Sequence, residues 1–252
     1  MKHLLFFLVF FIMFSSWGLD AVPLDKQWEY FDEKFSVQGG EITDGKNLGD
    51  IRWGRHADFE RLVLDIHKSL DFQKGPAAEV PCYFTVKYEY YPYRLTVELN
   101  GIRSREAEFG DLICSQYIER TYSLPYLDDS GIMFSIALNK PVKIEVFELH
   151  SPGRIVIDIA ENEFPQKLQP VFSVRTKTGL GIEELRYLQE RAGKEEGFNP
   201  RIIKGENGEL FLEAGFYNTL EKAQSKMAKI SSLIEGRVFF IEERGPACTP
   251  GP

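Results

Sequence analysis

Residues 61–66, which read RLVLDI, decide the fold, because this run is β-prone and two further copies of its pattern follow. The copies are RLTVEL at residues 94–99 and RIVIDI at residues 154–159. Successive side chains of a strand point to opposite faces, so Leu62, Leu64 and Ile66 are expected on one face. Each run therefore predicts a strand with one face in a core.

Further strand candidates lie around these copies, at Tyr83–Tyr90, Gly131–Leu138 and Val142–Leu149. Many short strands separated by turn residues are typical of an antiparallel sandwich. We therefore predict an antiparallel β-sandwich over residues 51–160. The arginines and acids of the three copies are expected to pair across strands in a structural role: Arg61, Arg94 and Arg154 with Asp65, Glu98 or Asp158.

The N-terminus predicts export. Lys2 and His3 precede an apolar run from Leu4 to Phe14, and small residues follow it. This is the layout of a secretory signal peptide, and the run is too short to cross a bilayer, which needs about 20 residues. We predict a signal peptide over residues 1–21 and a periplasmic location. Residues 22–50 are expected to be an arm that docks on the sandwich as a short helix or strand.

The charge balance argues against several partners. Removal of residues 1–18 takes Lys2 away, so the 30 Lys and Arg become 29 against 38 Asp and Glu, and the formal charge becomes −9. Such an acidic chain is poorly suited to nucleic acid or anionic lipid. We expect no nucleic-acid partner and no membrane insertion after signal cleavage.

A second, smaller domain is predicted after a polar link at residues 161–170, which contains Pro165 and Pro170. Its expected elements follow the order βαββαβ: strand Val171–Arg175, helix Ile182–Ala192, strands Arg201–Lys204 and Glu209–Ala214 around Asn207-Gly208, a helix capped by Asn218, and strand Val238–Ile241. This split-βαβ arrangement places both helices on one sheet face. The fold class is thus mixed and two-domain, with the second domain at residues 171–243 and a disordered tail at 244–252.

Two stretches carry a family resemblance in this second domain. FSVR at residues 172–175 is an aromatic-x-Val-polar strand, and FLEAGFY at 211–217 with Glu221-Lys222-Ala223 is a strand, glycine, aromatic and helix start. Together they resemble the sporulation-related repeat (SPOR) domain, although Thr176-Lys177-Thr178 replaces the usual glycine-aromatic ending and Arg175 replaces the commoner glutamine. SPOR domains bind peptidoglycan glycan strands on the uncovered sheet face, so the resemblance implies glycan binding here.

The sandwich region also carries a resemblance. Residues 51–65 read IRWGRHADFERLVLD and residues 142–158 read VKIEVFELHSPGRIVID. These two ends look like the amidase N-terminal (AMIN) group, in its AMIN-like branch. Members of that group are β-sandwiches that place envelope proteins against peptidoglycan or within secretion machinery.

The glycan face is predicted from strand alternation. If Val174 and Leu212 face the helices, then Arg175, Phe211 and Glu213 point away from them. Phe211 would be the stacking platform for a sugar ring, and Arg175, Lys177 and Glu213 the polar contacts. The alternative is that these are ordinary solvated positions, with Phe211 tucked under a loop or the other domain.

Catalytic patterns are missing from the sequence. It has no His-Glu-x-x-His helix, no Gly-x-Ser-x-Gly elbow and no Cys-x-x-Cys pair, and His56 is expected to orient a turn rather than to bind zinc. Gly179-Leu180-Gly181 lacks the third glycine of a nucleotide loop and predicts a turn. We therefore predict no enzyme activity, no catalytic residue, no metal site and no cofactor. Cys82 and Cys114 are either a disulfide or two free thiols.

The predicted function is that of a non-catalytic, peptidoglycan-binding protein of the bacterial cell envelope. Its partners would be glycan strands, and other envelope proteins are further candidate partners. The alternative is a periplasmic adaptor that binds other envelope or secretion proteins without glycan contact.

Signal cleavage gives the first testable prediction. The mature N-terminus should lie near Leu19 or Val22, because the small residues that favour cleavage precede these positions. Intact-mass measurement on protein from the native envelope checks this. A mass that still includes residues 1–14 would contradict the prediction.

Overall fold

The computed structural model describes residues 24–245 except 72, 106, 110–113, 127–128, 206, 235 and 237–238. The predicted signal peptide and residues 246–252 of the predicted tail lie outside the described residues. Arg244, which we assigned to that tail, instead ends a strand and is buried.

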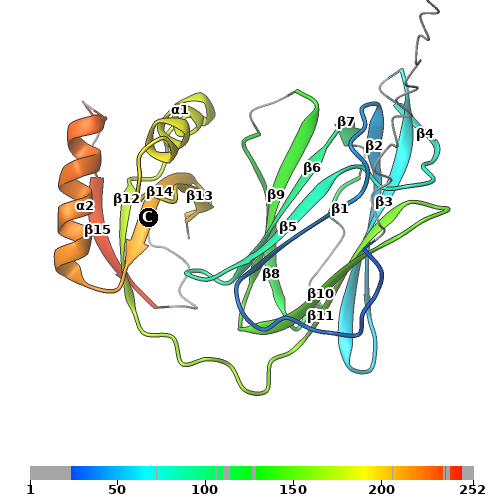
Figure 1. Ribbon diagram of the computed structural model, residues 1–252, viewed down its shortest axis with the longest axis horizontal. Helices are drawn as coiled ribbons and strands as arrows, with labels where there is room; N and C mark the ends of the chain where they lie inside the picture. Colours follow the sequence, from blue (N-terminus) through cyan, green and yellow to red (C-terminus); the bar gives the residue numbers. More distant parts are fainter. Residues whose placement is uncertain are drawn as a thin grey trace, which may run out of the picture.

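The first part of the chain is built from strands (Figure 1). They are β1 (Phe35–Gly39), β2 (Lys46–Arg55), β3 (Phe59–Leu70), β4 (Gln73–Ala77), β5 (Phe84–Glu89), β6 (Arg94–Asn100), β7 (Ile102–Arg105), β8 (Ile118–Leu124), β9 (Gly131–Leu138), β10 (Val142–Leu149) and β11 (Arg154–Glu161). One sheet has the order β1-β5-β6-β9-β8, and the other has the order β10-β11-β3-β2-β7 with β4 beside β3. Neighbouring strands are antiparallel except β2 and β7, which are parallel.

The three copies of the repeated pattern form β3, β6 and β11, and their alternation is confirmed. Leu62, Leu64 and Ile66 are all buried in the main core. The first and third copies are neighbours, and their register places Arg61 opposite Asp158 and Arg154 opposite Asp65. Arg61 donates to Asp158 at 2.6 and 2.7 Å, and Arg154 donates to Asp65 at 3.1 Å. The shared pattern therefore gives two reciprocal ion pairs.

The arginine of the second copy has a different partner. Arg94 pairs with Glu89 at 2.9 Å, across the turn between β5 and β6, and not with Glu98. The reason is the register, which places Arg94 directly opposite Glu89.

The segment predicted as an arm supplies more structure than expected. It contains β1 and half of β2, so strands of both sheets begin before residue 51. The described residues before β1 and those between β1 and β2 lie outside the strands, and Phe31 forms an isolated bridge with Ile144 of β10.

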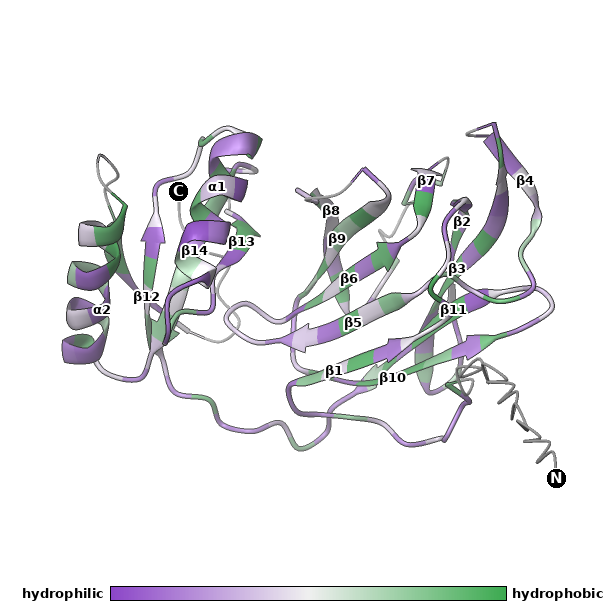
Figure 2. Ribbon diagram, turned by 45° about the horizontal axis from the view of Figure 1, so that its top comes forward, coloured by the Kyte–Doolittle hydropathy of each residue, from purple (hydrophilic) through white to green (hydrophobic). Residues whose placement is uncertain are grey.

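The second part alternates strands and helices in the order β12 (Val171–Thr176), α1 (Ile182–Gly193), β13 (Arg201–Lys204), β14 (Leu210–Tyr217), α2 (Leu220–Leu233) and β15 (Phe239–Arg244). Its sheet has the order β13-β14-β12-β15. The apolar stripes of the helices pack on one face of this sheet, and their polar sides point outward (Figure 2). A mixed class rich in β-strand, with two helices among the described residues, is thus confirmed.

The cap of α2 differs from the sequence prediction. Thr219, not Asn218, precedes the helix in an extended conformation, and its side chain accepts a hydrogen bond from the backbone N–H of Lys222 at 3.3 Å. The helix therefore starts one residue later than the Asn218 cap implied.

The two parts contact each other directly. Arg201 of β13 donates to the carbonyl oxygens of Tyr90 and Tyr91 at 2.9 Å each, and Arg94 donates to the carbonyl oxygen of Ile202 at 2.8 Å. The second core also includes residues of β8 and β9, namely Tyr122, Leu124 and Ala137. The β5–β6 turn thus covers part of the sheet face that we predicted to be left open.

Glu89 joins this contact and gives the second testable prediction. Burial alone would raise its pKa, but the charges of Arg94 and Arg201 and the hydroxyl of Thr96 lower it to about 2. A folded-state pKa below the unfolded value of 4.5 stabilises the protein above about pH 4.5, and this contribution is lost as the pH falls towards 2. Between about pH 6 and about pH 3 we expect Glu89 to account for a loss of about 2 kcal/mol in the free energy of unfolding.

Urea unfolding of the wild type and of Glu89→Gln at several pH values measures this effect. The variant should be less stable at neutral pH and should lose less stability on acidification. Parallel pH curves for the two proteins would show that Glu89 is not the group responsible.

Candidate functional site

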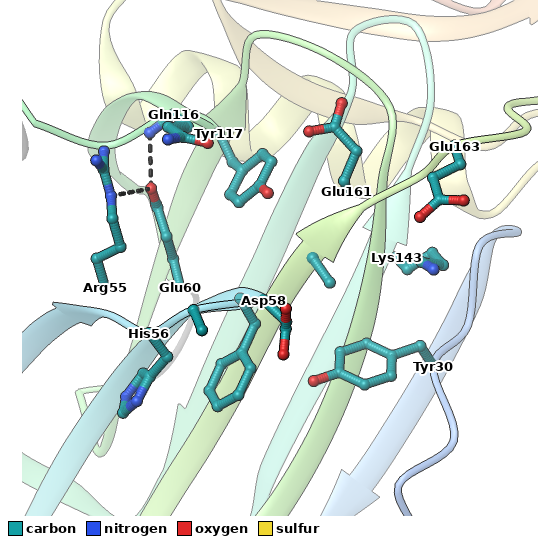
Figure 3. Close-up of a pocket in the computed structure, with 13 residues that line it drawn as sticks. Tyr30, Arg55, His56, Asp58, Glu60, Gln116, Tyr117, Lys143, Glu161 and Glu163 are labelled. Carbon is teal, nitrogen blue, oxygen red and sulfur yellow. Dashed lines mark hydrogen bonds and ion pairs between the residues drawn. The ribbon is translucent and has the colours of Figure 1, made fainter.

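An open cleft of about 540 Å³ lies at one end of the six-stranded sheet (Figure 3). We call it the Arg55 cleft, and its lining residues are Tyr30, Arg55, His56, Ala57, Asp58, Phe59, Glu60, Gln116, Tyr117, Lys143, Ala160, Glu161 and Glu163. Its volume is within the range of small-molecule and peptide pockets, roughly 300–1,000 Å³. The cleft is therefore large enough to hold a short polypeptide segment.

The turn between β2 and β3 forms one side of the cleft. The backbone N–H of His56 donates to the carbonyl oxygen of Phe59 at 2.8 Å, which closes the turn. The ring of His56 stacks on Phe59, with centroids 4.5 Å apart and an angle of 18° between the planes. His56 thus orients a turn, as the sequence predicted, and the pair presents a flat aromatic surface.

Glu60 is buried at the base of this side and fixes its surroundings. Its carboxylate accepts hydrogen bonds from the Ser115 hydroxyl at 2.6 Å, the backbone N–H of Gln116 at 2.7 Å and the Trp53 indole at 3.2 Å. Arg55 Nε lies 3.8 Å from the same carboxylate. These contacts join β2, β3 and the start of β8.

Arg55 carries the positive charge beside Glu60. Its guanidinium also donates to the carbonyl oxygen of Cys114, and the side chain remains 48% exposed. Because a guanidinium has five N–H donors in a fixed plane, these contacts leave donors for a bound molecule. Arg55 is therefore held in place and accessible at the same time.

Two tyrosines complete the lining. Burial, together with the charge of Glu161, raises the pKa of Tyr117, and burial with the charge of Asp158 raises the pKa of Tyr30. Both phenols therefore stay protonated at neutral pH.

Across the cleft, Glu161 and Glu163 lie near Lys143 (Figure 3).

The predicted glycan residues lie elsewhere, on the sheet of the second part. Arg175, Phe211 and Glu213 are fully buried, and the guanidinium of Arg175 stacks on the Phe211 ring at 3.8 Å from its centroid. Glu213 accepts hydrogen bonds from Ser173 at 2.6 Å and from Arg201 at 2.9 Å. Only Lys177 is exposed. In this arrangement Phe211 presents no platform to a sugar ring.

The cysteines do not form the possible disulfide. Cys82 and Cys114 are both free thiols; Cys82 is buried in the main core, whereas Cys114 is exposed beside the Arg55 cleft. Burial raises the pKa of Cys82 to about 12, so its thiol stays protonated.

The described residues contain no group of three or more His, Cys, Asp and Glu side chains arranged to hold a metal ion. In the same part of the chain, no helix is long and apolar enough to cross a membrane.

Comparisons with known proteins give one informative similarity. No family model matches the chain, and no solved structure matches it. The chain is 27% identical over 175 residues to "Peptidyl-prolyl cis-trans isomerase 9" of Caenorhabditis briggsae. The match covers 65% of this chain and 42% of that protein, so the chain spans less than half the length of this relative.

This similarity corrects the function predicted from the sequence. A relative named as an isomerase contradicts a non-catalytic, peptidoglycan-binding protein and its adaptor alternative, and it contradicts the expectation of no enzyme activity. The prediction of no enzyme activity rested on the absence of nucleophile, metal-ligand and phosphate-loop motifs. Arg55 lies within residues 51–65, which resemble the AMIN-like branch, but a single arginine forms no such motif.

Glu213 provides the third testable prediction. Replacing it by Gln removes the carboxylate that pairs with the buried guanidinium groups of Arg201 and Arg244. Breaking a buried pair from one side is strongly destabilising, so we expect a loss of about 3 kcal/mol in the free energy of unfolding. Guanidinium chloride denaturation measures it. Glu209→Gln, at an exposed position of the same hairpin, is the control and should change stability by less than about 0.5 kcal/mol; equal effects would contradict the prediction.

Proposed function

We propose that the protein is a peptidyl-prolyl cis–trans isomerase that binds a polypeptide segment in the Arg55 cleft. The observation that carries this proposal is the accessible Arg55 guanidinium beside the stacked His56–Phe59 pair in one open cleft. The similarity to a protein named as such an isomerase supports it.

Rotation about a prolyl peptide bond makes few chemical demands on the protein. Rotation about a peptide bond has a barrier of about 18–20 kcal/mol because resonance gives the C–N bond double-bond character. No covalent bond forms or breaks. As the bond twists, the prolyl nitrogen loses its conjugation and gains a lone pair that can accept a hydrogen bond. A donor aimed at the twisted amide therefore stabilises the transition state more than either planar ground state.

Arg55 is suited to be that donor. It is permanently charged, and its contacts with Glu60 and Cys114 hold the guanidinium before substrate arrives. A donor that is already oriented requires no rearrangement when the amide twists.

The aromatic lining is suited to the proline ring of the substrate. A pyrrolidine ring is compact and apolar, and the stacked His56–Phe59 pair offers an aromatic surface on which it can pack. The protonated phenols of Tyr30 and Tyr117 can donate to carbonyl oxygens of the flanking peptide.

We also propose that the chain consists of two folding units, a β-sandwich and a βαββαβ unit. The separate hydrophobic clusters and the strand-free stretch between Glu161 and Val171 support this division. Export remains a prediction of the sequence.

The fourth prediction tests the isomerase directly. A short peptide with one Xaa–Pro bond interconverts in tens to hundreds of seconds without a catalyst, and the mature protein should shorten this time at catalytic concentration. NMR exchange between the cis and trans signals measures the rate. Arg55→Ala should lower kcat/KM at least ten-fold, which corresponds to about 1.4 kcal/mol of lost transition-state stabilisation.

Arg52→Ala is the matched control, because Arg52 lies on the same strand and its partner is Asp65, outside the cleft. It should retain the wild-type rate. The proposal is wrong if the wild type does not exceed the uncatalysed rate, or if a folded Arg55→Ala variant is as active as Arg52→Ala.

A further inference from the structure

The residues just before β1 form a separate feature that reaches the Arg55 cleft. We call residues 24–31 the strap. The backbone N–H of Glu148 donates to the carbonyl oxygen of Leu24 at 2.8 Å, and Phe31 and Ile144 exchange two backbone hydrogen bonds of 2.8 Å each. Since β10 is an edge strand of its sheet, the strap is attached to that edge at both of its ends.

Between these ends the strap is fastened by Lys26. Its ammonium lies 2.8 Å from Glu145 and 2.6 Å from Asp158, and both carboxylates are almost fully buried. The aromatic rings of Trp28 and Phe147 flank it, with centroids 4.3 and 4.7 Å from Nζ. Burial alone would lower the pKa of Lys26, but the two carboxylates outweigh burial and raise it. Lys26 is therefore a charged group held inside a cage of acids and aromatic rings.

The backbone of the strap also binds the carboxylate of Glu145. The N–H groups of Gln27 and Trp28 donate to one oxygen of Glu145 at 2.8 and 2.6 Å. Two successive N–H groups converge on one anion because Trp28 adopts the left-handed region, with φ of 62°. That conformation is unfavourable for a residue with a side chain, so the contact with Glu145 maintains it.

The strap also lines the cleft. Tyr30, four residues after Lys26, is one of the cleft residues, and its side chain lies opposite Asp58 (Figure 3). Phe59 connects the two sites, because its ring lies 5.6 Å from Lys26 Nζ and also stacks on His56. The strap thus supplies part of one wall of the cleft.

We infer that Lys26 is a positioning residue: it fastens the strap on Glu145 and Asp158 and so holds Tyr30 in the wall where a polypeptide binds. The part of this inference that concerns polypeptide binding rests on the proposed isomerase function. Without Lys26, Asp158 retains Arg61, whereas Glu145 keeps, among the described residues, only hydrogen-bond partners that belong to the strap itself. The strap then loses the ammonium group that attaches it to the sheet. As a result, the side chain of Tyr30 loses its fixed position.

The fifth prediction compares Lys26→Met, which keeps the length of the side chain but not its charge, with Lys26→Arg, which keeps the charge. Hydrogen exchange of the amides of Gln27, Trp28 and Phe31 should become at least ten-fold faster in Lys26→Met and stay near wild type in Lys26→Arg. In the isomerase assay Lys26→Met should raise KM several-fold and leave kcat within about two-fold, since Arg55 is unchanged. Lys74→Met is the control, because Lys74 pairs with Asp50, outside the cleft.

The possible failures are distinguishable. Wild-type exchange rates in Lys26→Met would overturn the fastening by Lys26, whatever the protein's activity. Faster exchange with an unchanged KM would overturn the link between strap and cleft. A wild-type protein without isomerase activity would refute the proposed function and the binding part of this inference, while the exchange rates would still decide whether Lys26 fastens the strap.

Discussion

Asp158 is fully buried, and the need to pair its charge fixes much of the six-stranded sheet around it. An ionised carboxylate away from water is costly unless cations and donors surround it. Arg61 approaches it from β3 and Lys26 from the strap. A shift of one residue between β3 and β11 would turn Arg61 to the opposite face and leave the carboxylate unpaired. The pairing therefore determines the strand register, and through Lys26 the path of the chain before β1.

A similar constraint joins the two parts of the chain. Glu213 and Glu89 both pair with Arg201, and the same guanidinium donates to the carbonyl oxygens of Tyr90 and Tyr91. One arginine of β13 thus has partners in its own sheet and in the β5–β6 turn of the first part of the chain. The relative placement of the parts depends on charge pairing as well as on apolar packing, which makes their contact specific and sensitive to pH.

Local pattern predicted the local structure well. Alternation assigned Leu62 and Leu64 to the core, and Asn207-Gly208 marked the hairpin between β13 and β14, where Gly208 has a φ of 81°. The burial of Phe211 and the choice of Glu89 over Glu98 as partner of Arg94 were not predictable in this way, because they depend on strand pairing and on contacts between distant segments. The Arg55 cleft was missed because an accessible guanidinium held beside Glu60 and a stacked pair of rings have no sequence motif.

The attachment of the strap has a consequence for the order in which the protein acquires its structure. Lys26 is separated by 119 residues from Glu145 and by 132 from Asp158. Closing so long a loop is entropically unfavourable until the strands at its far end have formed. The strap is thus among the last segments to fold, and the outer edge of β10 stays accessible to other chains until then. Dilution or a chaperone that occupies this edge during synthesis should therefore raise the yield of folded protein more than it raises the stability of the finished molecule.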